Sequence, residues 1–347
     1  MRLFLFAIGA RDRASSRLRI WDHVDWLRAA GHTVVADSLT PPARELTRAR
    51  LARRILTRLP KWIAAFFRAD AVVIQETLLL WPLIALRRLG KRRTVVFDFS
   101  DPVDRIHGRG GLRALAFRRM IEGADSVMVE NRRYQANLTG TRRPVLHQYG
   151  PVDTARYREG RALVDAGPEM GHRLRIGWTG SPGTYRFIAP LVPIIDRIAA
   201  NTPLELCLIG MERIPETLEH AKLTLLEWDE TDEFHQVPTF DLALFRLEPT
   251  EDAQWRGAGK LFIYMAAGVP FVATDSGIAH DVMEESHVGF PVATDGEWES
   301  VLRQAIADRE ERHRMSHLSL QHADRELSYD RYRERLTALL QASGERA

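Results

Sequence analysis

The chain repeats one pattern twice, with short apolar runs alternating with longer amphipathic stretches of helical spacing. The runs in the first half are RLFLFAIG (2–9), TVVADSL (33–39), AVVIQET (71–77), TVVFDFS (94–100) and SVMVEN (126–131). Those in the second half are RLRIGWTG (173–180), LELCLIG (204–210), LTLLEWD (223–229), DLALFRL (241–247), PFVATD (270–275) and VGFPVAT (288–294). Nearly continuous apolar strands with intervening helices are typical of a parallel sheet covered on both faces. We therefore predict an α/β fold with two Rossmann-like, doubly wound domains.

The length of 347 residues also favours two domains. We expect a first domain at 1–155, a polar linker at 156–172, a second domain at 173–325 and a C-terminal helix at 326–347 that packs back on the first domain. Ligands of such sheets bind at the carboxyl ends of the strands, so the best crevice is expected between the domains.

In the first half we expect helices near 17–30, 43–68, 79–90, 110–123 and 132–138. Pro60 lies inside the second of these, and it should kink or interrupt that helix because proline lacks a backbone N–H.

Charge is distributed unequally along the chain. Residues 1–150 carry a net charge of +15 and the remainder carries −12, so the first domain should meet something anionic. The single cysteine, Cys207, has no disulfide partner in the chain and is expected in a buried strand, which fits a reducing, cytoplasmic compartment. The first apolar run is read as a strand rather than a signal peptide, and no stretch reaches the ~18 apolar residues of a membrane span.

The stretch WRGAGKLFIYMAAGVPFVATDSG (255–277) places a lysine at the start of a short apolar helix, in a chain that otherwise uses arginine almost exclusively. Gly259 allows close approach of a ligand, and the free N–H groups at a helix start attract anions. We interpret Arg256, Gly259 and Lys260 as a diphosphate site. The alternative is a solvated lysine that happens to begin a helix.

A second turn, IGWTGSPGT (176–184), follows the first strand of the second domain. Its glycines, amides and the hydroxyls of Ser181 and Thr184 suit phosphate oxygens. The turn has neither a Walker ending nor a Rossmann fingerprint, and a purely structural turn is an equal alternative.

At these residues the chain resembles a known family. GWTGSPGT (177–184), GAGKLFIYMAAGVPFVATDSG (257–277) and VGFPVATDGEW (288–298) are similar to the C-terminal domain of retaining GT-B glycosyltransferases of family four. RASSRLRIWDHVDWLRAAGH (13–32), FDFSDPV (97–103) and QYGPVDTARY (148–157) resemble the first-domain and linker motifs of that family. The resemblance covers about residues 2–340.

The resemblance implies a hexosyl-type transferase that moves a sugar, with retention, from a nucleotide diphosphate to a hydroxyl acceptor. The nucleotide sugar is a co-substrate, and no cofactor is implied; no metal is implied either, since the chain has no Asp-x-Asp motif. The acceptor would be a glycan, a lipid-linked molecule or a small molecule.

The resemblance also assigns candidate residues to each part of the site. The candidates for the donor diphosphate are Gly180, Ser181, Thr184, Arg256, Gly259 and Lys260; those for the donor sugar or nucleoside are Trp228, Glu251 and Ile263. Arg13, Ser16 and Arg17 are acceptor-side candidates, with a solvated turn as the alternative. The catalytic candidates are Asp101, Glu130 and Asn131, and helix capping is the alternative for Asp101. Asp98 is expected to be structural.

The sequence departs from the family at one pattern. Many members carry two glutamates flanking this helix entry, and here their positions fall on Trp255 and Ile263, which cannot accept bonds from ribose hydroxyls. A non-catalytic GT-B protein that binds nucleotides or sugars, or acts as a scaffold, is therefore the alternative to a transferase.

The segment 44–68 is strongly basic and has apolar residues at helical spacing. Such a helix can contact an anionic membrane surface, and ALRRLGKRR (85–93) adds further positive charge. The alternative is an ordinary domain helix with a solvated arginine face. Nucleic acid is not expected as a partner, because the arginines are not interleaved with aromatic residues.

Overall fold

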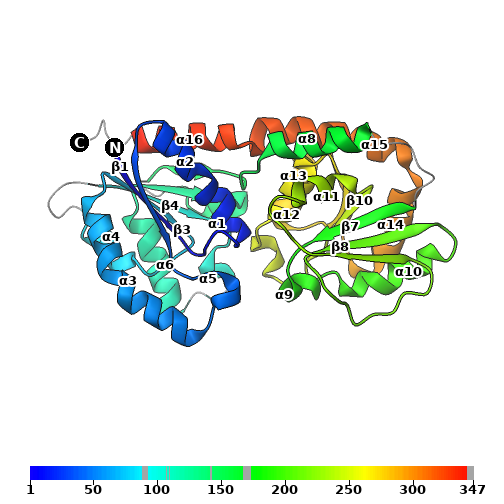
Figure 1. The fold of residues 1–347 in the computed structure, drawn as a ribbon, viewed down its shortest axis with the longest axis horizontal. Helices are drawn as coiled ribbons and strands as arrows, with labels where there is room; N and C mark the ends of the chain where they lie inside the picture. Colours follow the sequence, from blue (N-terminus) through cyan, green and yellow to red (C-terminus); the bar gives the residue numbers. More distant parts are fainter. Residues whose placement is uncertain (88–92, 107, 109, 141–142, 167–172, 342–347) are drawn as a thin grey trace. The chain divides into compact units, whose positions relative to one another are not determined.

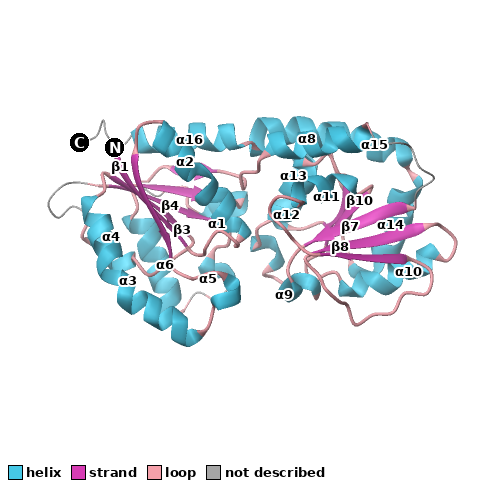
Figure 2. Ribbon diagram, in the orientation of Figure 1, coloured by secondary structure: helices cyan, strands magenta, loops and turns pink. Residues whose placement is uncertain are grey.

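The computed structural model describes residues 1–87, 93–106, 108, 110–140, 143–166 and 173–341. The chain divides into two compact units. Unit 1 contains Met1–Pro151, Trp255–Gly257 and the chain from Asp330 onward, and unit 2 contains Val152–Gln254 and Ala258–Tyr329. Each unit is built on a six-stranded sheet with helices on both sides (Figures 1 and 2). The predicted α/β fold with two doubly wound domains is confirmed.

The sheet of unit 1 is parallel throughout and has the order β2-β1-β3-β4-β5-β6. Its strands are β1 (Arg2–Ala7), β2 (Thr33–Ser38), β3 (Ala71–Gln75), β4 (Thr94–Phe99), β5 (Ser126–Val129) and β6 (Val145–His147). The order reverses between β1 and β3. In an open α/β sheet this switch point is where ligands bind, outside the carboxyl ends of the strands.

The helices of this unit cover both faces of the sheet. They are α1 (Ala14–Arg19), α2 (Val24–Ala29), α3 (Arg48–Arg68), α4 (Trp81–Ala85), α5 (Val103–Ile106), α6 (Gly111–Gly123), α7 (Arg132–Asn137) and α16 (Tyr329–Gln341). One face packs aromatic side chains of β1 and β4 against α3, α4 and α6, as Phe6 against Trp62 shows. The opposite face packs alternate strand residues against Ile20, α2 and α16.

The sheet of unit 2 is also parallel, with the order β12-β11-β10-β7-β8-β9. Its strands are β7 (Leu174–Thr179), β8 (Leu204–Ile209), β9 (Lys222–Leu226), β10 (Leu242–Phe245), β11 (Phe271–Thr274) and β12 (Phe290–Val292). Its helices are α8 (Thr154–Asp165), α9 (Pro182–Tyr185), α10 (Val192–Ala199), α11 (Glu233–Gln236), α12 (Gly259–Ala266), α13 (Gly277–Ser286), α14 (Trp298–Ala307) and α15 (Arg309–His322). The order reverses between β7 and β10, as in the doubly wound dinucleotide-binding fold.

Two expectations about single elements need correction, and one strand was not expected. The helix expected at 17–30 is divided, because Ile20 leaves the helical region (φ −125°, ψ −61°) between α1 and a short 3-10 turn. Helix α3 runs without interruption through Pro60, whose exposed position keeps the ring out of the core. The strand β6 was not anticipated, since its three residues give too short an apolar run.

The segment expected as a polar linker, 156–172, is helical over most of its described part. Helix α8 begins after Asp153, whose carboxylate accepts a hydrogen bond from the N–H of Arg156. Its buried face packs on α11, with Tyr157 4.6 Å from the ring of Phe234. Gly160 is required there, because a Cβ would lie 1.8 Å from the carbonyl oxygen of Phe234. Residues 167–172, and 88–92 of the second basic stretch, lie outside the described residues.

Helix α16 joins the end of the chain to the core of unit 1. Tyr332, Leu336 and Leu340 are buried in the cluster formed with β1, β3 and α2. Although this helix lies far from the other core elements in the sequence, it is part of the core of unit 1.

Replacing Leu336 with alanine should lower the free energy of unfolding by about 2–4 kcal/mol, since the side chain is 2% exposed and its loss leaves a cavity. Chemical denaturation measures the change. Leu163→Ala is the matched control, because Leu163 is 65% exposed and its truncation should change stability by no more than about 0.5 kcal/mol. Equal effects of the two substitutions would contradict the core role of α16.

Candidate functional site

The switch point of unit 2 brings together the two segments that the sequence singled out. Strand β7 ends at Thr179 and leads into the turn at Gly180, and β10 leads through residues 246–258 to the start of α12. Because β7 and β10 are neighbours in the sheet, both segments lie at the same carboxyl edge.

The turn after β7 is built for close approach. A Cβ at Gly180 would lie 2.3 Å from the ring of Trp178 and 3.0 Å from Cε of Lys260, so only glycine fits. A Cβ at Gly210, after β8, would lie 2.0 Å from the carbonyl oxygen of Gly180. Ser181 and Thr184 form a reciprocal capping box at the start of α9. The predicted turn residues thus belong to a compact turn that the capping box and the close approach of Gly210 hold in place.

Lys260 reaches over this turn from the first turn of α12. Its Nζ lies 5.6 Å from the centroid of the Trp178 ring, and its side chain makes no ion pair with any described carboxylate. Burial lowers the pKa of Lys260 from 10.5 to about 8. A cation that has lost part of its hydration without gaining a counter-ion favours the arrival of an anion.

The other residues predicted for the donor are placed as follows. Trp228 follows β9 and lies beside Gly210, and a Cβ at Gly259 would meet no atom within 4 Å. Glu251 is exposed, whereas Ile263 is 6% exposed and faces the core. Arg256 belongs to the short segment of unit 1, where burial and Glu76 raise the pKa of Asp101 and the charge of Arg256 partly offsets this rise.

At the switch point of unit 1, the loop after β1 is fixed by hydrogen bonds to β3. The hydroxyl of Ser16 accepts a hydrogen bond from the N–H of Gly9 and donates one to Oε1 of Gln75, and each of these bonds is 3.0 Å long. Ser16 and Arg17 are buried, and Arg13 is exposed with its guanidinium 3.8 Å from Glu76. Among the three acceptor-side predictions, Arg13 is the side chain that solvent reaches freely.

Glu76, directly after β3, is a residue that sequence reasoning missed. Its backbone is left-handed (φ 55°), which is uncommon for a residue with a side chain. Its carboxylate accepts hydrogen bonds from the hydroxyls of Ser100 and Ser15. The position after a buried strand at a switch point is the one sequence signal that could have identified it.

Asp101 lies close to Glu76. Its Oδ1 accepts a hydrogen bond of 2.8 Å from the N–H of Gly257. Burial, and then the negative charge of Glu76, raise the pKa of Asp101. Two carboxylates from the ends of neighbouring strands are thus held together and partly shielded from water, which is an arrangement suited to proton transfer or to stabilising positive charge.

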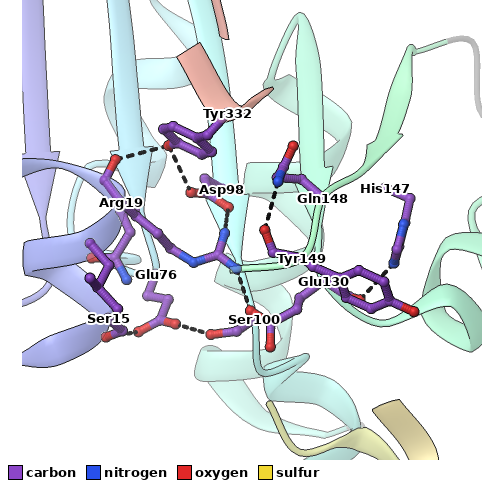
Figure 3. A network of polar contacts seen from close by, with 12 residues as sticks. Ser15, Arg19, Glu76, Asp98, Ser100, Glu130, His147, Gln148, Tyr149 and Tyr332 are labelled. Carbon is purple, nitrogen blue, oxygen red and sulfur yellow. Dashed lines mark hydrogen bonds and ion pairs between the residues drawn. The ribbon is translucent and has the colours of Figure 1, made fainter. Parts of the chain in front are cut away.

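A second group of carboxylates is fully occupied (Figure 3). The buried guanidinium of Arg19 bridges Asp98 and Glu130, and the hydroxyl of Tyr332 donates to the carbonyl of Arg19 over 2.8 Å. Burial raises the pKa of Asp98 to about 6, against the lowering effect of Arg19. The expected structural role of Asp98 agrees with these contacts.

Two of the three predicted catalytic residues also have structural contacts. Glu130 is 3% exposed and paired with Arg19, and its carbonyl lies 3.0 Å from the ring of His147. Asn131 is 0% exposed and caps α7, its side chain accepting from the N–H of Tyr134. Asp101 is the most accessible of the three, and catalysis by any of them stays a prediction.

In the described ranges, no three His, Cys, Asp or Glu side chains are grouped so that they could hold a metal ion. No helix of these ranges is both long and apolar enough to span a membrane.

Comparison with known proteins supports the fold. No protein-family model matches the chain, and no curated protein sequence matches it. Sucrose-phosphate synthase from Thermosynechococcus elongatus is 12% identical, with a TM-score of 0.72 and 100% of each chain covered. HepE of Anabaena in complex with UDP-glucose is 13% identical, with a TM-score of 0.70 over 98% of this chain and 99% of that one. A glycosyltransferase from Rickettsia africae is 12% identical, with a TM-score of 0.65 and 98% of each chain covered. The chain thus has the GT-B fold.

The lowered pKa of Lys260 predicts a specific pH dependence of stability. The folded-state value of about 8 lies below the usual 10.5, so the charged ammonium opposes folding below pH 8. The free energy of unfolding should rise from pH 8 to 10.5, as the folded protein releases this proton first. Lys260→Met should stabilise the ligand-free protein by about 1–3 kcal/mol at pH 7 and remove the rise.

Denaturant titrations at several pH values test this, with Lys222→Met as control. Lys222 is exposed and lies 3.4 Å from Glu205, so its loss should give no stabilisation. A destabilised Lys260→Met protein would show that the ammonium is well solvated or paired.

Proposed function

We propose that this protein is a retaining glycosyltransferase that moves a hexosyl group from a nucleotide diphosphate sugar to a hydroxyl acceptor without a metal ion. The observation that carries the proposal is the partly desolvated ammonium of Lys260, which has no described counter-ion and lies over the Gly180 turn at the switch point of unit 2. The GT-B fold, which HepE in complex with UDP-glucose shares, supports a nucleotide-sugar donor.

Lys260 and the turn of Gly180, Ser181 and Thr184 hold the diphosphate. The start of α12 favours the same anion, since its first N–H groups and its dipole point toward it. As the bond between the anomeric carbon and the phosphate oxygen breaks, negative charge grows on the leaving diphosphate. A fixed ammonium stabilises this charge most in the transition state, which is what a catalyst requires.

Retention follows when the acceptor hydroxyl attacks the same face of the sugar from which the diphosphate leaves. The electron pair of the broken bond goes to the phosphate oxygen, which then takes the proton of the hydroxyl. In unit 1, Asp101 with Glu76 beside it is the candidate carboxylate for stabilising positive charge.

The acceptor is a hydroxyl-bearing glycan, a lipid-linked molecule or a small molecule, and Arg13 is its most accessible predicted contact. The basic helix α3 brings the protein to the inner face of an anionic membrane.

Removing the ammonium should weaken the donor site. Lys260→Met should weaken binding of UDP, or of whichever nucleotide stabilises the wild-type protein in a thermal-shift panel of nucleotide sugars, by at least about tenfold. Isothermal titration calorimetry measures the change, and Lys222→Met should bind like wild type. Equal nucleotide affinity of the two variants would remove Lys260 from the site.

Asp101→Asn should leave nucleotide affinity unchanged and lower the rate of donor turnover by about a hundredfold. Because burial and Glu76 raise the pKa of Asp101, activity should fall with decreasing pH at a pKa above the usual aspartate range. Release of the nucleotide from the sugar gives the rate, and NMR of the product gives the anomeric configuration. Nucleotide binding without turnover of any donor would favour the non-catalytic alternative, and an inverted product would exclude retention.

A further inference from the structure

Helices α3, α4 and α6 form one layer on a single face of the unit 1 sheet. Their buried residues, among them Trp62, Ile84 and Phe117, belong to the same core cluster as Phe4 and Phe97. Figure 1 shows the three helices on one side of the sheet, with α1, α2 and α16 on the other. The outward sides of α3, α4 and α6 therefore form one surface, which we call the α3–α6 surface.

The α3–α6 surface is strongly basic. Helix α3 has seven arginines and lysines and no acidic residue, and α6 has three arginines and one glutamate. Asp37, which also accepts a hydrogen bond from Trp62, pairs with Arg54 and Arg58 and fixes the helix to β2. Arg48, Arg53, Lys61 and Arg68 make no ion pair with any described residue, and all four are exposed. Their charge is available to an external anion.

The same surface exposes leucines. Leu56 of α3 is 78% exposed and Leu112 of α6 is 72% exposed. Leu46, Leu86 and Leu115, on the connected segments and on α6, are also exposed, so that five of the nine large apolar residues exposed among the described residues belong to this layer. On α3, Arg53 precedes Leu56 by three positions and Pro60 follows it by four, which places all three on one side of the helix.

We propose that the α3–α6 surface docks on an anionic lipid bilayer, with its cations at the headgroups and Leu56 and Leu112 in the interface. Cations flanking exposed leucines match the two attractions of an interfacial helix, which are charge and apolar burial. Nucleic acid fits less well, because none of the large apolar residues exposed in the described ranges is aromatic and able to stack on bases. The proposal names the membrane partner of the proposed glycosyltransferase and rests on that function, although lipid binding itself does not require sugar transfer.

Sedimentation with vesicles tests the proposal on the full-length protein. Vesicles of phosphatidylcholine with about 30 mol% phosphatidylglycerol should bind the protein, and pure phosphatidylcholine should not. The double variant Arg48→Glu/Arg53→Glu should bind anionic vesicles at least about tenfold more weakly. Leu56→Ser leaves the charge unchanged and should still weaken binding by about two- to fivefold, since an exposed leucine contributes by insertion.

The double variant Arg28→Glu/Arg331→Glu is the charge-matched control. It makes the same change in net charge on α2 and α16, on the other face of the sheet, and should bind like wild type. Circular dichroism and thermal unfolding establish that each variant is folded; Arg28, Arg48, Arg53 and Leu56 are exposed, and Arg331 is half-buried.

Three results would overturn the proposal: no binding to anionic vesicles, equal losses in the two double variants, or full binding by Leu56→Ser together with equal binding to a DNA duplex. The last result would identify a general polyanion surface. Calorimetry with the nucleotide on the same samples separates this test from that of the proposed function, since vesicle binding without nucleotide binding leaves the surface intact and rejects the donor site.

Discussion

The interpretation of unit 2 depends on a lysine that is partly desolvated and makes no ion pair with any described residue. The ammonium of Lys260 lies near the Trp178 ring and over a glycine, and burial depresses its pKa. A fold that merely needed to fill this space would gain stability from an apolar side chain, since an unpaired buried cation costs free energy. Such a cost is typical of a site whose partner arrives from solution.

In unit 1, by contrast, the buried cation Arg19 is paired with carboxylates. Arg19 is enclosed by Asp98 and Glu130, and Tyr332 closes the group from the C-terminal helix. A satisfied buried network gives little net stability, but it fixes the positions of its members because removal of any one leaves a buried charge unpaired. At this carboxyl edge, Glu130 is held in the ion pair with Arg19. The two other carboxylates are Asp101, whose pKa is raised by burial, and Glu76, whose backbone is left-handed. The network therefore supports this edge of the sheet, beside the pair formed by Asp101 and Glu76.

The sequence predicted the secondary structure correctly where a local pattern of residues decides it. The long apolar runs became strands, because their residues are buried on both faces of a parallel sheet. Local rules failed where packing between distant segments decides. The polar segment after residue 153 is a helix because Tyr157 and Gly160 fit against Phe234, which lies far away in the sequence. Pro60 stays inside α3 because Trp62 and Phe66 hold the following turn in the core and Asp37 binds the preceding one.

The same distinction explains what could be known of the two sites. Gly180 and Lys260 were visible in the sequence, because a glycine turn after a strand and a cation at a helix start are each short motifs. Glu76 and Arg19 were not, because their meaning comes from partners 24 and 111 residues away, in Ser100 and Glu130 respectively. Tyr332 lies 313 residues from the carbonyl that it binds. A candidate anion site made of backbone N–H groups and one cation can be predicted from a short stretch of sequence. The pKa values of a carboxylate cluster cannot, because they are set only when the sheet brings its strands together.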